Sequence, residues 1–500
     1  MSSIVPGSHL RVAIPFDAES FNEIWRNYTG AGGYFVANNI YSRLVVQDVF
    51  GNKGVGPDLA ERWDVSDDGI TYTIHLNPSA KWEDGVPLTA EDVAYTYRTV
   101  LDNAYHGLTW IQDIDEIRAL DDHTLEIKLK QPNAGFLGLL GSFVFSHIIA
   151  KHLYEGTDWE TNPHNWEPIG SGPFKFDKWI KGDRIELVGN PDYWGEGPYL
   201  ERLTYYVMSK EDAEKGIENG DIHFSIYGIP AADIDQWRAK PGVDVLAESG
   251  NSIGFMAFNW TQDRFQDRRV REAFARAVNR PAIAEAIYPP LKTPQHYYLE
   301  KIDWAFNPDA KAPDYDLDTA AELLDDAGYT ADENGKRMSL RIAARALYPH
   351  YTIAAETIAK ELAKLGIEAT VETLTPVEWV EQVQKAGDFD LAMEAGDIGP
   401  DPDQLSSFLA SDGPRNIMRY KNDVVDECLK AGKSVFDTEE RGKHYKRLQS
   451  ALAADIARVP LIQYGEYLPY RTEFTGWSWS DGVRGTVPFW YAGKIRPSGK

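Results

Sequence analysis

The sequence predicts a large α/β protein of about three compact units. The first observation is composition: the chain has 500 residues, of which 43% are apolar and 12% aromatic, enough for several cores. The second is a mixture of strand and helix patterns in residues 10–132. The third is a regular alternation of helix and strand patterns from about residue 314, which is typical of βαβ units.

The first part of the chain mixes strands with helices. LRVAIP (10–15) is a short apolar run and TYTIHLN (71–77) alternates with period two, so both predict strands. Thr89, with Asp92 three residues on, is an N-cap that opens a helix. DDHTLEIKLKQP (121–132) alternates again. This part is therefore expected to pack as α+β.

The middle of the chain predicts a hairpin, a strand and a helical segment. Residues 168–195 contain two strand-like runs and close on the turn NPDYWG. FMAFNW (255–260) is a third strand candidate, and a helical pattern follows it. Arg268, Arg271 and Arg276 lie off the apolar stripe of that helix. The stripe is formed by Val270, Phe274, Ala277 and Val278.

From about residue 314 the pattern is helix, strand, helix, strand, helix, strand, which contains a βαβαβ run. In open α/β sheets, ligands bind beyond the carboxyl ends of the strands. Arg345 falls at one such end. The stretch MEAGDIGPDPDQ (393–404), with its acids, glycines and prolines, falls at another. Both are candidate ligand-binding positions.

Charge and cysteine content exclude several classes of function. The formal charge is −26 and the pI is near 4.8, which argues against nucleic acid and favours a soluble monomer. The single cysteine, Cys428, excludes a disulfide framework and predicts a buried small residue. No apolar run reaches the roughly 18 residues that span a bilayer. The start of the chain lacks a signal-peptide pattern, and VPGSH (5–9) resembles a cloning remnant.

Motifs for catalysis, cofactors and metals are missing from the sequence. It has no G-x-S-x-G, no phosphate-binding glycine loop and no H-E-x-x-H, and TGAGG (29–33) lacks the dinucleotide fingerprint. DIGPDPDQ supplies oxygens but lacks the glycine and glutamate of a calcium-binding EF-hand loop. We therefore expect no enzyme, no cofactor and no metal, although a carboxylate pair for glycoside hydrolysis stays open.

Four ordered blocks resemble a known family. GPDLAERWDVSDDGITYTIHLNPSAKWEDGVPLTAEDVAYTY (56–97) is similar to the signature of the extracytoplasmic solute-binding proteins, family 5, which serve peptide, nickel and opine ABC importers. IGSGPFKFDKWIKGDRIELVGNPDYWG, VREAFARAVNRPAIAEAIY and YDLDTAAELLDDAGY resemble further blocks in the family's order. The resemblance runs from about residue 10 to 490.

The resemblance implies a two-lobed periplasmic-binding-protein clamp (type II, cluster C). Lobe I would combine residues 10–45, 170–260 and 476–500. An extra α+β domain, 46–169, would pack on lobe I, and lobe II would span 261–475. Two chain crossings would act as a hinge, and ligand would close the lobes.

The resemblance also implies a ligand site. Arg345 matches the arginine that holds a ligand carboxylate in the dipeptide-binding branch, and Asp397 matches the aspartate that pairs with a ligand ammonium. Arginine suits a carboxylate because it offers a bidentate fork. The simpler alternatives are a salt bridge for Arg345 and a turn cap for Asp397. The other acids of 393–404 would be solvated or cap the following helix.

Other candidates come with open alternatives. Glu394 stands where that branch carries Trp, which favours a polyhydroxylated or cationic ligand, unless Glu394 is an outward-facing strand residue. Trp260 and Tyr348 are candidate stacking rings, with core packing as the alternative. Asn27 and Tyr28 are candidates for the edge of lobe I.

These observations predict a non-enzymatic solute-binding protein, periplasmic or extracytoplasmic, that delivers a small zwitterionic solute to a membrane ABC permease. A di- or oligopeptide is favoured, with an opine or oligosaccharide as the alternative. Uptake of nickel is a weaker alternative, because no histidine cluster marks it. From another class, a peptide or glycoside hydrolase remains the rival hypothesis.

Overall fold

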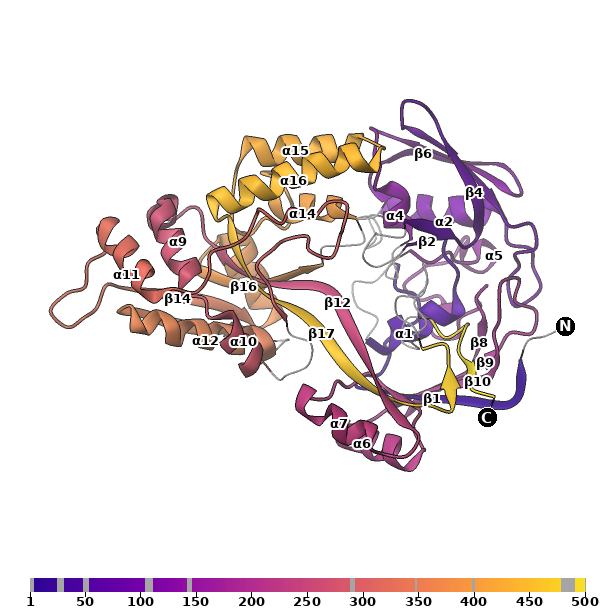
Figure 1. Cartoon of the computed structure of the whole chain (residues 1–500). Coiled ribbons are helices and arrows are strands. Elements are labelled where there is room, and N and C mark those ends of the chain that lie inside the picture. Colours follow the sequence, from indigo (N-terminus) through magenta and orange to yellow (C-terminus); the bar gives the residue numbers. More distant parts are fainter. Residues whose placement is uncertain are drawn as a thin grey trace. The chain divides into compact units, whose positions relative to one another are not determined.

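The computed structural model describes residues 4–24, 31–47, 54–103, 111–141, 146–287, 293–346, 349–397, 401–477 and 491–499. The chain divides into two compact units. Unit 1 comprises Met1–Ile229, Asp233–Glu248 and Tyr467–Lys500, and unit 2 comprises Pro230–Ala232 and Ser249–Glu466. The two long passages between the units fall inside strands β12 (Val243–Phe258) and β17 (Arg458–Arg471) (Figure 1).

The unit boundaries lie earlier in the chain than the sequence suggested. The expected limits of lobe II were 261 and 475, whereas unit 2 begins its main segment at Ser249 and ends at Glu466. Residues 46–169 belong to unit 1. A separate extra domain for that segment stays a prediction.

Unit 1 contains five strands of the largest sheet, in the order β11-β1-β10-β9-β8. Strands β1 and β10 are parallel, and β8 and β9 form the predicted hairpin, with Phe174 opposite Gly189 and Ile180 opposite Arg184. The bounds are β1 Val5–Ile14, β8 Phe174–Ile180, β9 Arg184–Gly189, β10 Leu200–Val207 and β11 Phe224–Ser225.

A second, antiparallel sheet of unit 1 has the order β4-β5-β7-β6. Its strands are β4 Ala60–Val65, β5 Thr71–Leu76, β6 Ile114–Asp121 and β7 Thr124–Leu129. Helix α2 (Ala90–Asn103) packs on β6 and β7. The carboxylate of Asp92 accepts the backbone N–H of Thr89 at 2.8 Å, so the expected helix start is confirmed.

The remaining elements of unit 1 are short. They are α1 Ala31–Ile40, β2 Val45–Gln47, β3 Val55–Pro57, α4 Phe136–Leu140, α5 Lys151–Tyr154, η1 Pro163–Asn165, α6 Lys210–Asn219, α7 Ile234–Arg238, β18 Phe474–Thr475 and β19 Arg496–Pro497. The 3-10 turn η2 (Ala231–Asp233) lies where the units meet in sequence.

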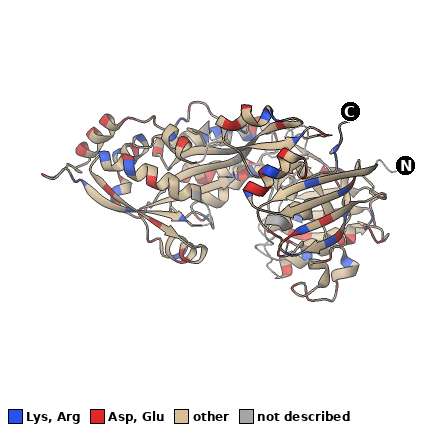
Figure 2. Cartoon of the chain, turned by 90° about the horizontal axis from the view of Figure 1, so that it is seen from below, with Lys and Arg blue, Asp and Glu red and all other residues tan. Residues whose placement is uncertain are grey.

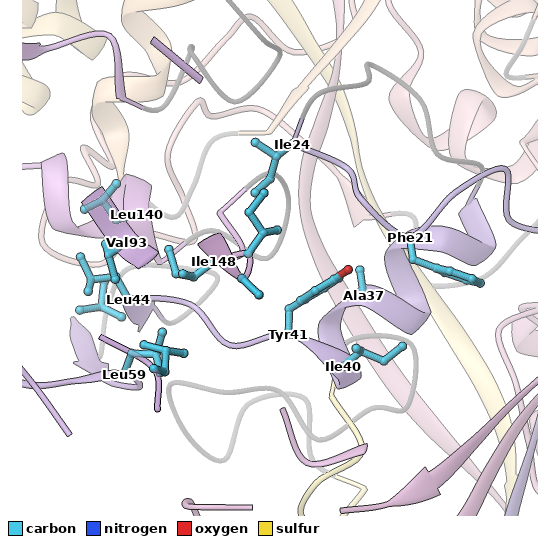
Figure 3. Close-up of a cluster of buried hydrophobic side chains, with 14 of the residues drawn as sticks. Phe21, Ile24, Ala37, Ile40, Tyr41, Leu44, Leu59, Val93, Leu140 and Ile148 are labelled. Carbon is cyan, nitrogen blue, oxygen red and sulfur yellow. The ribbon is translucent and has the colours of Figure 1, made fainter. Parts of the chain in front are cut away.

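One hydrophobic core joins segment 46–169 to the rest of unit 1. Figure 3 shows Ile40, the last residue of α1, and Tyr41, which follows it, together with Leu59, Val93 and Ile148. Each of these side chains is at most 5% exposed. Because apolar area removed from water stabilises the folded chain at about 25 cal/mol per Å², this shared core explains why the segment belongs to unit 1.

Unit 2 is built on the strand order β15-β14-β16-β12-β17. Strand β14 lies between β15 and β16 and is parallel to both, as the βαβαβ pattern predicts, and β12 runs antiparallel to β16. The bounds are β13 Thr293–Pro294, β14 Met338–Arg345, β15 Ile367–Leu374 and β16 Leu391–Asp397.

Helices cover both faces of this sheet, since successive residues of its strands enter different cores. Ile342 and Met393 pack in one apolar cluster, whereas Ala343 and Ala392 pack in another. Figure 1 shows α10 and α12 on one side of β14 and β16, and α15 and α16 on the other. Parallel strands buried on both faces are the expected product of βαβ crossovers.

The helices of unit 2 follow the predicted order. They are α8 Asp263–Gln266, α9 Arg268–Arg276, α10 Arg280–Ala286, α11 Leu317–Asp326, α12 Pro349–Lys364, α13 Pro376–Glu378, the π-helix η3 Trp379–Ala386, η4 Pro402–Gln404, α14 Leu405–Leu409, α15 Asp423–Ser434 and α16 Thr438–Asp455.

The helical pattern of residues 267–288 forms two helices, α9 and α10, and the short helix α8 precedes it. Asn279 caps α10 by accepting the backbone N–H of Ala282 at 3.1 Å. Within α9, Arg271 lies off the apolar stripe but is only 4% exposed. Its guanidinium donates to the backbone carbonyls of Phe265 and Asp455. A buried arginine is tolerated here because backbone oxygens satisfy its donors.

Charged residues of both signs are interspersed on the helices and strands of each unit (Figure 2). Cys428 is buried, as predicted. Among the described residues, no helix is long and apolar enough to cross a membrane.

Candidate ligand-binding site

Arg345 is the last residue of β14, at the carboxyl end predicted for a ligand site. Its guanidinium carbon lies 4.6 Å from the centre of the Trp379 ring. Its Nε atom is buried without a hydrogen-bond partner. Within the described part of the chain no carboxylate lies at ion-pair distance from Arg345, so the described side chains give no support to the alternative of a structural salt bridge.

The sheet register brings Glu394 and the backbone of Asp397 to the same edge. Ala343 of β14 pairs with Ala392 of β16, and two residues further along each strand are Arg345 and Glu394. Neighbouring strands are about 4.8 Å apart, so these two positions are adjacent on one face. Asp397 is the last residue of β16 and pairs with Ser252 of β12.

Glu394 is 4% exposed and therefore does not face solvent. One of its carboxylate oxygens lies 3.7 Å from Nη1 of Arg458, which is 2% exposed. The guanidinium carbon of Arg458 lies 3.7 Å from the ring centre of Phe255, the residue opposite Glu394 across β12 and β16. The alternative of an outward-facing strand residue is therefore wrong for Glu394.

Burial and neighbouring charges shift the pKa values of Glu394 and Arg458 in opposite directions. Burial raises the pKa of the Glu394 carboxyl above its ordinary value, although Arg458, Arg415 and Arg345 act to lower it. Burial likewise lowers the pKa of Arg458, against the effect of Glu394. Arg458 therefore offsets part of the charge of Glu394, and a role of Glu394 in selecting a polyhydroxylated or cationic ligand stays a prediction.

The acids that follow Asp397 have structural partners. Both carboxylate oxygens of Asp401 accept from Arg441, at 2.9 and 3.0 Å, and Asp401 also caps η4. Asp403 is 8% exposed and accepts the hydroxyl of Ser406, and burial raises its pKa. The helix after DPDQ is α14, whose N-cap Gln404 makes no side-chain cap, so the expected cap of that helix is not formed; Asp401 caps the preceding turn η4 instead. Asp401 and Asp403 are also buried, so neither is a solvated acid.

Trp260 is not brought to this edge. It follows β12, whose Phe258 pairs with Leu391 at the start of β16, the end opposite Asp397. The indole N–H of Trp260 donates to the carbonyl of Ala457 at 3.0 Å, and the guanidinium of Arg271 lies 4.0 Å from its ring. These contacts belong to core packing. Asn27, Tyr28 and Tyr348 lie outside the described residues.

Three residues at this edge were missed by the sequence analysis. They are Trp379, Phe255 and Arg458. The sequence could have indicated Trp379, because it lies in the first turn of a predicted helix, after Pro376. That helix begins just after the strand that neighbours the strand of Arg345. Arg458 had none, because nothing in the local sequence connects it to β16.

The chain belongs to the bacterial extracellular solute-binding proteins, family 5, whose description (family 5 Middle) matches residues 54–416. Members of this family are binding proteins and not enzymes. This match confirms the resemblance noted in the sequence. Metal ligands do not gather in the described part of the chain, where no group of three His, Cys, Asp or Glu could hold an ion.

Particular relatives support the same family. Di/tripeptide-binding protein 1 of Pseudomonas aeruginosa (strain UCBPP-PA14) is 28% identical over 89% of this chain and 87% of its own length. The periplasmic binding protein DppA of Helicobacter pylori, solved with the peptide STSA, is 26% identical, with a TM-score of 0.80 and 98% of each chain covered.

A third protein, AgaA from A. tumefaciens R10, solved with agropinic acid, shares the fold with a TM-score of 0.79 and 24% identity, covering 98% of this chain and 99% of its own. The predicted fold class, an α/β two-lobed solute-binding protein, is confirmed.

Proposed function

We propose that this protein captures a small zwitterionic solute, preferably a di- or oligopeptide, outside the cytoplasm and delivers it to a membrane permease of an ABC importer. The observation that carries the proposal is Arg345, whose guanidinium has no carboxylate partner among the described side chains. A partly buried guanidinium left without a partner is costly, and a ligand carboxylate would supply two parallel hydrogen bonds.

Asp397 supplies the second anchor of this proposal. Its backbone lies three residues beyond the level of Arg345 on the neighbouring strand, which corresponds to about 10 Å along the strands. An extended chain covers at most about 3.5 Å per residue. The two positions therefore suit a peptide of two or three residues with one charged end at each anchor.

An opine is the second candidate, because AgaA, which shares this fold, was solved with agropinic acid. An opine also carries a carboxylate that Arg345 would hold. It differs from a peptide in lacking a peptide bond and a free primary amine in the peptide arrangement. An opine would therefore depend on Arg345 as a peptide does but less on Asp397.

A thermal-shift screen tests the proposal. The panel contains dipeptides, tripeptides, opines, oligosaccharides and nickel chelates at about 1 mM, where a micromolar ligand stabilises the folded protein by about 4 kcal/mol. We expect dipeptides or tripeptides to raise the melting temperature. A response to opines alone would show that the ligand is an opine and not a peptide. A response only to oligosaccharides or nickel chelates would refute the zwitterion anchor.

A further inference from the structure

A pocket of about 560 Å³ lies in unit 1. Its lining comes from the β2–β3 pair and the start of β4, from Asn77 just after β5, from the turn after β9 and from the C-terminal segment. The volume falls within the roughly 300–1,000 Å³ typical of small-molecule sites. Arg345 and Asp397 belong to unit 2, so this unit-1 pocket is separate from the proposed solute site.

Three aromatic side chains form part of the lining: Tyr193, Trp194 and Tyr491. The indole N–H of Trp194 donates to the carbonyl of Ser171 at 3.0 Å. The ring centres of Tyr193 and Trp194 are 5.3 Å apart, with the planes at 52°. Tyr491 is 7% exposed. These rings are therefore held by their surroundings and do not have to be ordered by a ligand.

Two glycines allow the tyrosine rings to lie close to the backbone. A Cβ atom at Gly195 would come within 2.7 Å of the ring of Tyr193, and one at Gly493 within 2.4 Å of the ring of Tyr491. Any larger residue would displace the rings. Rings fixed before binding reduce the entropy that a ligand has to overcome.

The lining carries more negative than positive charge. Its described residues include Asp58, Glu61 and Glu196, and the one cation among them is Lys494, whose Nζ lies 3.9 Å from Glu196. Asp58 is held in place because it accepts the backbone N–H of Arg43 at 3.0 Å. Glu61 is exposed, and no described lysine, arginine or histidine lies within ion-pair distance of it.

We propose that the unit-1 pocket binds an organic monocation, an ammonium or guanidinium group carried by a small molecule. Aromatic ring faces attract such a cation, and the carboxylates Glu61 and Asp58 add charge of the opposite sign. A bare metal ion fits less well, because no group of three His, Cys, Asp or Glu among the described residues could ligate one. A neutral sugar could stack on the rings but would not use the excess negative charge.

Calorimetric titration of the full chain tests this site with choline, agmatine and 3,3-dimethylbutanol, the uncharged shape analogue of choline. We expect both cations to bind, and the neutral analogue to bind at least about fivefold more weakly. Glu61→Gln should weaken choline binding by about fivefold or more, since it removes one charge at close range. Gly195→Ala should also weaken binding, because it moves the Tyr193 ring without changing any charge.

The control variants distinguish binding in this pocket from binding elsewhere on the protein. Glu116→Gln changes another exposed acid of unit 1, on β6, and should leave choline binding unchanged. Arg345→Ala and Asp397→Asn should do so as well, whatever their effect on peptides. Circular dichroism checks that each variant is folded.

Three results would overturn the proposal. One is equal affinity for choline and its neutral analogue, and another is loss of choline binding in Asp397→Asn, which would place the cation in unit 2. The third is absence of binding by both free cations at millimolar concentration. If an arginine-rich peptide then bound and Glu61→Gln abolished that binding, the pocket would recognise a protein partner instead of a small molecule.

Discussion

Arg345→Ala is expected to weaken peptide binding by about 2–5 kcal/mol, because truncating one partner of a buried charge pair leaves the other charge without compensation. At about 1.4 kcal/mol for each factor of ten, the dissociation constant should rise roughly 30-fold to several thousand-fold. The same variant should lose little affinity for a peptide whose carboxyl terminus is amidated, since that ligand has no carboxylate to lose.

The variant should also remain folded. Arg345 makes no ion pair with the described side chains, and its closest interaction of note is the Trp379 ring at 4.6 Å, worth about 0.5–1 kcal/mol. We therefore expect a melting temperature within about 2 °C of the parent protein when no ligand is present. A loss of binding can then be assigned to the site and not to unfolding.

Isothermal titration of one dipeptide and its amide is the assay, and Arg341→Ala is the matched control. Arg341 lies on the same strand but pairs with Asp388 and Glu372, so its removal should leave affinity unchanged. The affinity of Arg345→Lys for the dipeptide should lie between those of Arg345→Ala and the parent protein, because lysine keeps the charge but loses the planar fork. Unchanged affinity in Arg345→Ala, or an equal loss for the amidated peptide, would remove Arg345 from the site.

Three other acids give testable predictions. Asp397→Asn should weaken peptides with a free amine by more than their N-acetylated forms in the same titration; equal losses would contradict an ammonium anchor. Glu394→Gln should lower the free energy of unfolding by about 3–5 kcal/mol in urea, because Arg458 stays buried without its carboxylate. Adding Arg458→Met should recover part of this loss. An unchanged free energy of unfolding in Glu394→Gln would show that the pair is not coupled. Burial raises the pKa of Glu83 to about 8 from 4.5, so between these pH values the folded state binds more protons than the unfolded state. The resulting contribution to the free energy of unfolding is fully present below pH 4.5 and is lost as pH rises through 8. Its slope is at most about 1.4 kcal/mol per pH unit. Glu83→Gln should flatten this part of the melting-temperature profile, and parallel profiles would contradict the assignment.

The sequence predicted the local elements of the site well because they depend on period and turn chemistry. The succession of helix and strand patterns from about residue 314 predicts strands at 338–346 and 389–396, which form β14 and β16, and the intervening helical patterns predict parallel neighbours. Arg345 and Asp397 are both terminal residues of such strands. Parallel strands bring their carboxyl ends to one edge, so the juxtaposition follows from the order of the elements.

Other parts of the site depend on contacts between distant segments. Asp401 pairs with Arg441, and Glu394 faces Arg458, although nothing near these acids in the sequence marks a basic partner. Arg271 lies off an apolar stripe yet is buried, and its guanidinium donates to the backbone carbonyl of Asp455, which is far away in the sequence. Periodicity shows which face of a helix is apolar, but it does not show whether another element covers the polar face.

The sequence by itself determined the family, the α/β class, the order of strands and helices in unit 2 and the strand-end position of Arg345. Only the tertiary structure decided the unit boundaries, the burial of Glu394 and the formation of the unit-1 pocket from segments far apart in the chain. The physical reason is that secondary structure follows from neighbouring residues, whereas burial and charge pairing follow from which distant surfaces meet when apolar area is removed from water.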